Sequence, residues 1–154
     1  MKAFIKAASL FLSVAILLSC LFSCSGGDVD TLDTVTEFER DFMTGGRIYS
    51  SAAAEGEDGY ISREMVDAFF GRDLPSEEYS LLVYSSLTEA QELGVFLLSD
   101  TADRPELISV IEERIKLFSS FFPGDSFILE KGRVISYGFF DNAEEAKKLL
   151  KSLL

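Results

Sequence analysis

Residues 93–98 constrain the fold more than any other part of the chain, because this segment is continuously apolar. In a β-strand successive side chains point to opposite faces, so Leu93, Val95 and Leu97 would share one face. Phe96 and Leu98 would lie on the other face, and neither face is suited to water. The segment is therefore predicted to be a central strand of a sheet that is covered on both sides.

Three further segments are expected to be strands. Residues 79–85 are rich in Leu, Val and Tyr, and residues 88–91 would connect them to the central strand as an antiparallel pair. Residues 127–130 and 133–140 would form a compact hairpin around a turn at Lys131 and Gly132.

Helical spacing of apolar residues predicts four helices. The first covers about residues 31–44, with Asp30 at its head, and the second runs from an N-cap at Ser62 to a stop signal at Gly71. The third begins at Asp100 or Asp103 and carries the strongest pattern in the chain, whereas the fourth opens with Asp141 and Glu144 in the spacing of a capping box. The apolar positions of these last two helices are Ile108, Ile111, Ile115, Phe118 and Phe122, and then Ala143, Ala146, Leu150 and Leu153.

These elements predict an α+β fold: a four-stranded, mainly antiparallel sheet made of two strand-strand-helix units, with two N-terminal helices. Residues 31–154 would form a single α+β domain, with a helical part at 31–71 and a ββαββα part at 75–154. The two units are expected to place their helices on one face of the sheet. The N-terminal helices, or a partner, would cover part of the second face around Phe96, Leu98 and Phe140.

The N-terminus has the layout of a secretory signal, because Lys2 and Lys6 precede a long uncharged apolar run. Ser19-Cys20 and Ser23-Cys24 each follow a Leu at the third position before the cysteine, which resembles the lipobox of bacterial lipoproteins. We expect residues 1–23 to be a lipoprotein signal peptide, Cys24 to carry the lipid, and residues 24–30 to be a flexible tether. Cys20 is the alternative lipidation site, but cleavage there would leave Cys24 as an unpaired thiol in an oxidising compartment. An uncleaved membrane anchor is a second alternative.

Composition excludes several classes of function. The chain has 26 acidic and 14 basic residues, and removal of a signal containing Lys2 and Lys6 leaves a formal charge of −14. Such a domain is not expected to bind nucleic acid. Histidine is absent, which removes the commonest general base and metal ligand, and no metal site or cofactor is expected.

No catalytic residues are predicted. Asp100, Asp103 and Asp141 stand at expected helix starts, where carboxylates cap the backbone. Glu112 and Glu113 are neighbours on a helix and diverge by about 100°, so they cannot face each other across a substrate. Ser119-Ser120 lacks a Lys at the spacing that a serine nucleophile needs, and the loop at residues 50–59 does not match the ligand positions of an EF-hand.

The second half of the chain resembles an uncharacterised family of lipoproteins from Clostridia and related Gram-positive bacteria, a domain of unknown function. The resemblance rests on short motifs: residues 89–96 (EAQELGVF), residues 111–114 (IEER), Phe122-Pro123 and residues 131–134 (KGRV). It implies a small surface lipoprotein and supplies no activity or catalytic residues.

The sequence thus predicts a non-enzymatic, lipid-anchored domain on the extracytoplasmic face of the cell membrane. Its expected partners are the membrane, through the N-terminal lipid, and another envelope protein or peptide. A small-molecule-binding accessory of a transporter and an acid-dependent extracytoplasmic hydrolase are the alternatives.

Overall fold

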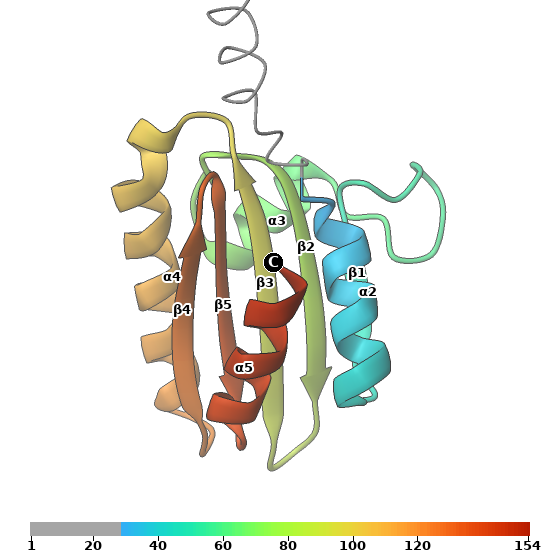
Figure 1. The fold of residues 1–154 in the computed structure, drawn as a ribbon, viewed down its shortest axis with the longest axis vertical. Helices are drawn as coiled ribbons and strands as arrows, with labels where there is room; N and C mark the ends of the chain where they lie inside the picture. The colour runs from blue at the N-terminus through green and yellow to red at the C-terminus, as the bar shows by residue number, and fades with distance from the viewer. Residues whose placement is uncertain (1–28) are drawn as a thin grey trace, which may run out of the picture.

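The computed structural model describes residues 29–154, which form one antiparallel sheet with helices on both faces (Figure 1). The five strands are β1 (Arg47–Ser50), β2 (Ser76–Ser85), β3 (Ala90–Leu98), β4 (Asp125–Lys131) and β5 (Val134–Phe140), in the spatial order β1-β2-β3-β5-β4. The helices are α2 (Thr31–Phe42), α3 (Arg63–Phe70), α4 (Arg104–Ser119) and α5 (Ala143–Leu153), and a 3-10 turn at Thr101–Asp103 precedes α4.

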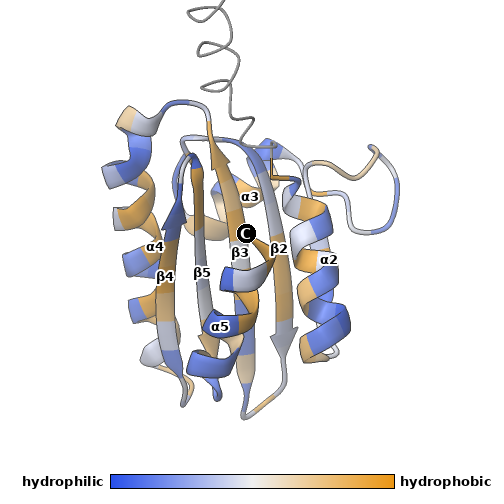
Figure 2. Cartoon of the chain, in the orientation of Figure 1, coloured by the Kyte–Doolittle hydropathy of each residue, from blue (hydrophilic) through white to orange (hydrophobic). Residues whose placement is uncertain are grey.

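The prediction for the central strand is confirmed. β3 lies between β2 and β5. Its residues Leu93, Val95 and Leu97 pack in one core cluster, whereas Phe96 and Leu98 pack in the other. The predicted antiparallel pairing of β2 with β3 and the hairpin of β4 with β5 are also present. Figure 2 shows the consequence, since apolar residues dominate β3 while polar residues cover the outer sides of the helices.

The helices do not lie where the sequence analysis placed them. α2 and α5 cover one face of the sheet, and α3 and α4 cover the other (Figure 1). The expectation that α4 and α5 share one face is therefore wrong, and the two N-terminal helices are likewise on opposite faces.

Chain connectivity explains this arrangement. β3 and β4 both pair antiparallel with β5, so they run parallel to each other and α4 joins them as a crossover. In Figure 1 this crossover is right-handed, as such connections almost always are, and its handedness fixes the face that α4 covers. α5 follows β5 and covers apolar side chains on the other face.

The sheet has five strands because β1 adds an edge strand that the sequence analysis did not predict. Arg47–Ser50 pairs antiparallel with β2. Ser50 also bridges to Tyr60, where the chain returns from the loop after β1. Four residues are too few to show a strand's alternation of apolar and polar side chains.

Two of the expected N-caps are confirmed. Asp30 Oδ1 accepts a hydrogen bond from the Asp33 N–H at 2.9 Å, and Ser62 Oγ accepts one from the Met65 N–H at 3.4 Å. Gly71 ends α3 with a φ of 76°, a left-handed conformation that glycine adopts without a steric cost.

Asp103 and Glu106, which also have the spacing of a capping box, do not form one, and neither do Asp141 and Glu144. Asp100, one of the two alternatives for the third helix, caps the 3-10 turn through the Ala102 N–H, so Asp103 already has a helical backbone and makes no side-chain cap. At the last helix Asn142, not Asp141, is the N-cap residue, and its side chain makes no capping hydrogen bond.

Candidate functional sites

The predicted lipidation sites, Cys24 and its alternative Cys20, lie outside the described residues, as do the signal at residues 1–23 and most of the tether. The described chain begins at Val29, which is half buried against the core under α2. Thr31 follows, and its backbone N–H and its hydroxyl both donate to Glu78 Oε1, at 2.9 and 2.7 Å. Glu78 pairs with Leu97 near the end of β3, so the N-terminal segment enters at this end of the sheet, which we call the tether end.

The most concentrated chemistry in the described residues is a buried polar cluster of Glu92, Arg114 and Tyr137. Glu92 comes from β3, Arg114 from α4 and Tyr137 from β5. The Arg114 guanidinium donates two hydrogen bonds to the Glu92 carboxylate, from Nε at 3.0 Å and from Nη2 at 2.7 Å. The Tyr137 hydroxyl donates to Glu92 Oε1. Both oxygens of the Glu92 carboxylate thus accept hydrogen bonds from protein groups. Only 1% of the side chain is exposed, so water does not supply these bonds.

Aromatic rings enclose the positive charge of this cluster. The guanidinium carbon of Arg114 lies 3.9 Å from the centre of the Phe69 ring and 4.5 Å from that of Phe118. Such cation–π contacts are stronger where water is excluded. Phe69 belongs to α3, so Arg114 joins α3 and α4 to the sheet.

Burial and charge shift two pKa values in the cluster. Burial of the Tyr137 hydroxyl, reinforced by the negative charge of Glu92, raises the Tyr137 pKa well above its usual value. Burial would lower the Arg114 pKa, but the hydrogen bonds and the charge of Glu92 outweigh burial and raise it. Both shifts favour a neutral Tyr137 beside a charged Arg114, so this is a stable arrangement that holds elements together. The buried Glu92 carboxylate and Tyr137 hydroxyl are closed to a substrate.

Sequence analysis did not find this cluster, although two signals were present. Glu92 lies two and four residues before Gly94 and Phe96, on the strand face that they share. Arg114 lies at helical spacing from Ile111 and Phe118, in the buried stripe of α4. A charged residue at a core position on each element indicates a buried pair.

The acids and serines considered for catalysis do not converge. Glu113 forms a surface ion pair with Arg72 at 2.8 Å, and Glu112 is exposed. The hydroxyls of Ser119 and Ser120 donate to carbonyls of their own helix. Within residues 29–154, no group of three or more Asp, Glu, Cys or His side chains is placed to hold a metal ion.

The phenylalanines at positions 139 and 140 are buried, whereas Phe121 is not. Phe139 packs against Phe118 of α4, and Phe140 packs against Phe38 and Phe42 of α2. Phe140 thus has a partner in α2, one of the two N-terminal helices. Phe96 and Leu98 lie on the opposite face, under α3 and α4, so the prediction that these two residues and Phe140 share one face is wrong. Phe121, by contrast, is 73% exposed.

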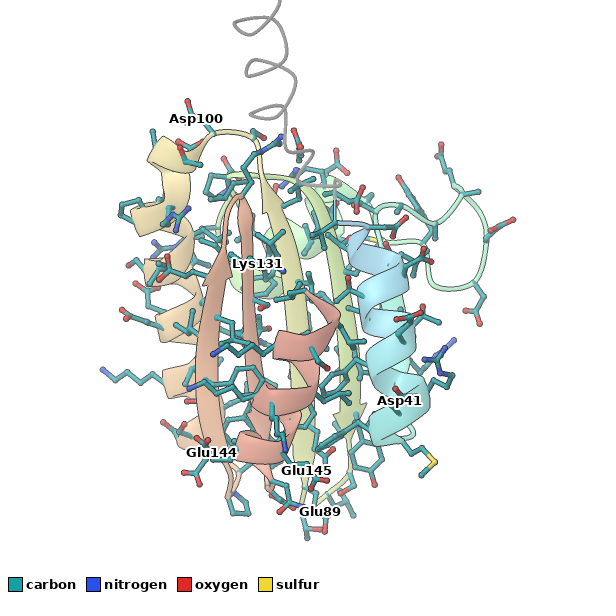
Figure 3. The ribbon with its side chains drawn as sticks, in the orientation of Figure 1. Asp41, Glu89, Asp100, Lys131, Glu144 and Glu145 are labelled. Atoms are coloured by element: carbon teal, nitrogen blue, oxygen red, sulfur yellow. The ribbon has the colours of Figure 1, made fainter. Side chains whose placement is uncertain are left out.

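Three exposed apolar side chains lie at the end of the sheet opposite the tether end. β2 turns into β3 at this end, and we call it the hairpin end. Leu87 lies in the turn and is fully exposed. Met43, which follows α2, is 79% exposed, and Phe121 lies just after α4, whose final turn reaches the same end (Figure 1). Figure 3 shows that acids surround this region, with Asp41, Glu89, Glu144 and Glu145 near it and Asp100 at the tether end.

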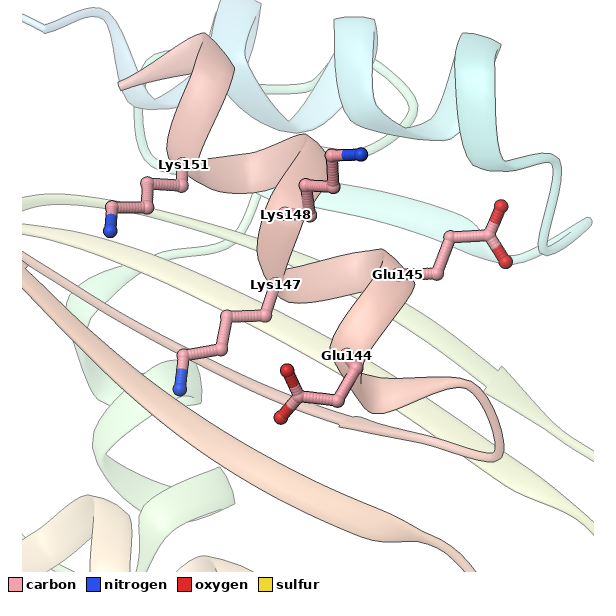
Figure 4. Close-up of a pocket in the computed structure, with 5 residues that line it drawn as sticks. All are labelled: Glu144, Glu145, Lys147, Lys148 and Lys151. Carbon is pink, nitrogen blue, oxygen red and sulfur yellow. The ribbon is translucent and has the colours of Figure 1, made fainter.

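Two hollows on the described surface lie at α5. One is lined only by side chains of α5, and Figure 4 shows them spreading from the outer surface of that helix with no opposing wall. Another lies beside the start of α5 and contains Asp125, Asp141, Glu144 and Glu145, all of them exposed. Acid catalysis needs a carboxyl group whose environment shifts its pKa, and exposed carboxylates lack that environment.

Comparison with models of protein families, with curated proteins and with solved structures found no match for this chain. The resemblance to Gram-positive lipoproteins therefore stays a prediction. No helix within residues 29–154 has the length and apolar character required to cross a membrane.

Proposed function

We propose that this protein is a lipid-anchored extracytoplasmic domain that binds another component of the cell envelope through its hairpin end and catalyses no reaction. The observation that carries the proposal is the exposure of Met43, Leu87 and Phe121 at the end remote from the point where the N-terminal segment enters. Lipidation of Cys24, with Cys20 as the alternative, is part of the same proposal.

The exposure of these side chains supports a binding role. A hairpin turn is normally polar or contains glycine, yet Leu87 presents its whole side chain to water. Large exposed apolar patches surrounded by polar residues mark protein-binding surfaces, and three exposed apolar side chains at one end of the domain support such a role. The position also suits a tethered domain, because the N-terminal anchor would not cover this end.

The alternatives have weaker support. A small-molecule-binding role needs a concave apolar pocket with a few converging polar groups. The hollows at α5 are lined mainly by charged side chains. A third hollow lies between α2, β1 and the loop after β1 and has a mainly small and apolar lining, but it is open to solvent. A hydrolase needs two acids in different environments, whereas the acids beside α5 are all exposed.

Membrane fractionation with mass spectrometry of the mature N-terminus tests the anchor. We expect the wild-type chain and Cys20→Ala to be found in the membrane fraction with lipid on residue 24, and Cys24→Ala to lose that lipid. Lipid on Cys20, or an uncleaved N-terminus, would contradict the assignment.

Site-specific photocrosslinking in intact cells tests the binding surface. A photoreactive amino acid at Leu87 is expected to give a discrete crosslinked species, and Phe121→Ser in the same chain should weaken it. Met65 provides the matched control, because it is also an exposed apolar residue, at 58%, but lies on α3. Equal crosslinking from residues 65 and 87, insensitive to Phe121→Ser, would argue against the hairpin end.

A further inference from the structure

The outer edge of β4 offers a second interaction surface. β4 is the last strand of the sheet, and within the described residues it pairs only with β5. β1 is the other edge strand, but it has four residues and the chain bridges back to it at Tyr60. β4 has seven residues, so it is the long open edge.

The residues with outward backbone groups can be identified. The Leu98 N–H donates to the Arg133 carbonyl, so the odd-numbered residues of β5 bond to β3 and the even-numbered ones bond to β4. In the β4–β5 register Leu129 pairs with Ser136, which places the bonded groups of β4 on its odd residues. The N–H and C=O groups of Ser126, Ile128 and Glu130 therefore point away from the sheet.

We propose that two copies of this chain pair along this edge, β4 to β4 and antiparallel, with the two-fold axis at Ile128, to form one continuous ten-stranded sheet. Ile128 would exchange two backbone hydrogen bonds with Ile128 of the second copy. Ser126 would do the same with Glu130 of the second copy. This pairing uses the outward N–H and C=O groups of all three residues.

Charge favours this register and a second copy as the partner. Asp125 lies opposite Lys131 of the second copy, and Phe127 lies opposite Leu129, so the strand is complementary to itself in reverse. A two-residue shift of register, centred on Phe127 or Leu129, would lose the pairing of Asp125 with Lys131. A four-residue shift, centred on Glu130, would place two Glu130 side chains opposite each other, which is unfavourable. The register at Ile128 avoids this.

The charged residues around the two ends of β4 would also be complementary between the two copies. Acids lie at one end of β4, where Asp125 shares a hollow with Asp141 and Glu144. At the other end Lys131 donates to the carbonyl of Leu154, at the end of α5. Figure 4 shows Lys147 and Lys151 on the same flank of α5 as Glu144. The two-fold axis would bring the acidic end of each edge to the basic end of the other.

The second copy would further bury apolar side chains on both faces of the sheet beside this edge. Ile128 is half buried on the face of α4, as are Ile108 and Ile115. Leu129 and Leu153 are half buried on the face of α5.

The pairing has a consequence for orientation. The axis is perpendicular to the sheet, so the second copy is inverted and the two tether ends point in opposite directions. Two copies anchored in one membrane would hold the sheet roughly parallel to the membrane, with both hairpin ends accessible. The inference does not depend on the lipid anchor or on the proposed partner.

Disulfide trapping tests it with the full mature chain purified in detergent. Asp125 and Lys131 of the second copy form a non-hydrogen-bonded antiparallel pair with Cα atoms about 4.5 Å apart, which a disulfide can span. Within one copy the same residues are about 20 Å apart along the strand and cannot be joined. The double variant Asp125→Cys/Lys131→Cys is expected to form a disulfide-linked dimer under mild oxidation, while neither single variant forms a covalent dimer. Absence of a dimer in the double variant, or equal dimer in the singles, would overturn the register.

A second variant tests pairing without cysteines. Ser126→Pro removes an outward N–H and keeps the bonds to β5, a substitution that edge strands tolerate. Sedimentation of the wild-type chain is expected to show a dimer, and Ser126→Pro should shift it toward monomer at an unchanged melting temperature. A monomeric wild-type chain at all concentrations would overturn the proposal.

Discussion

The guanidinium of Arg114 and the carboxylate of Glu92 form a two-fold hydrogen-bonded ion pair inside the protein, with 14% and 1% of their side chains exposed. One residue comes from a helix and the other from the central strand. A paired geometry of this kind is the strongest form of a charged hydrogen bond. The loss of either partner would leave the other charge buried and uncompensated.

Glu92→Gln should therefore destabilise the protein strongly. The substitution keeps the shape and removes the charge, so we expect the free energy of unfolding to fall by about 3 to 5 kcal/mol. The double variant Glu92→Gln/Arg114→Met should cost less than the sum of the two single variants, because no unpaired charge remains. Denaturant unfolding followed by circular dichroism measures both, since the chain has no tryptophan.

Arg72→Met is the matched control for that pair. Arg72 binds Glu113 on the surface, and both side chains are largely exposed. We expect Arg72→Met to lower the free energy of unfolding by less than about 1 kcal/mol. An equal loss in Glu92→Gln and Arg72→Met would show that burial of the inner pair contributes nothing.

Tyr137→Phe should change how stability depends on pH. The pKa of Tyr137 is raised in the folded protein, so its contribution is fully present below the unfolded value of about 10 and is lost as the pH rises through the folded pKa. The wild-type chain should lose stability between pH 9 and about 11 more steeply than Tyr137→Phe. Parallel curves for the two proteins would mean that Tyr137 ionises alike in the folded and unfolded states.

The sequence predicted the strands better than the positions of the helices, for a physical reason. An unbroken apolar run such as residues 93–98 has few solutions besides a strand covered on both faces. An amphipathic helix, however, shows only that one side is buried. The stripes of α4 and α5 contain no information on which face of the sheet each helix covers, and the chain connectivity decides it.

The elements that the sequence analysis missed depend on distant residues. β1 is a strand because Arg47–Ser50 pairs with a long β2, not because of its own pattern. Glu92 and Arg114 are 22 residues apart, and only the fold brings them together. The caps show the same limit on a local scale, because the 3-10 turn after Asp100 gives the N-cap residue Asp103 a helical backbone, and its side chain makes no capping hydrogen bond.

Two aspartates at helix starts give a matched test of these caps. Asp30 accepts a hydrogen bond from the Asp33 N–H, whereas Asp103 makes no side-chain cap. Asp30→Ala should therefore lower the free energy of unfolding by about 0.5 to 2 kcal/mol. Asp103→Ala should change it by less than about 0.5 kcal/mol. Equal effects in thermal unfolding would show that the difference in hydrogen bonding has no energetic weight.

Gly94→Ala tests how tightly the buried cluster is packed. Gly94 lies on the face of β3 that Glu92 and Phe96 share, and an added Cβ would overlap the Tyr137 ring and lie 2.8 Å from Phe96 Cε2. Replacing glycine by alanine in an extended segment usually stabilises a protein by restricting the unfolded chain, by about 0.4 to 1 kcal/mol. Here the overlap should dominate, because the hydrogen bond to Glu92 holds the Tyr137 ring in place. We expect a net loss of about 1 to 3 kcal/mol in denaturant unfolding, and a gain in stability would mean that the ring can move aside.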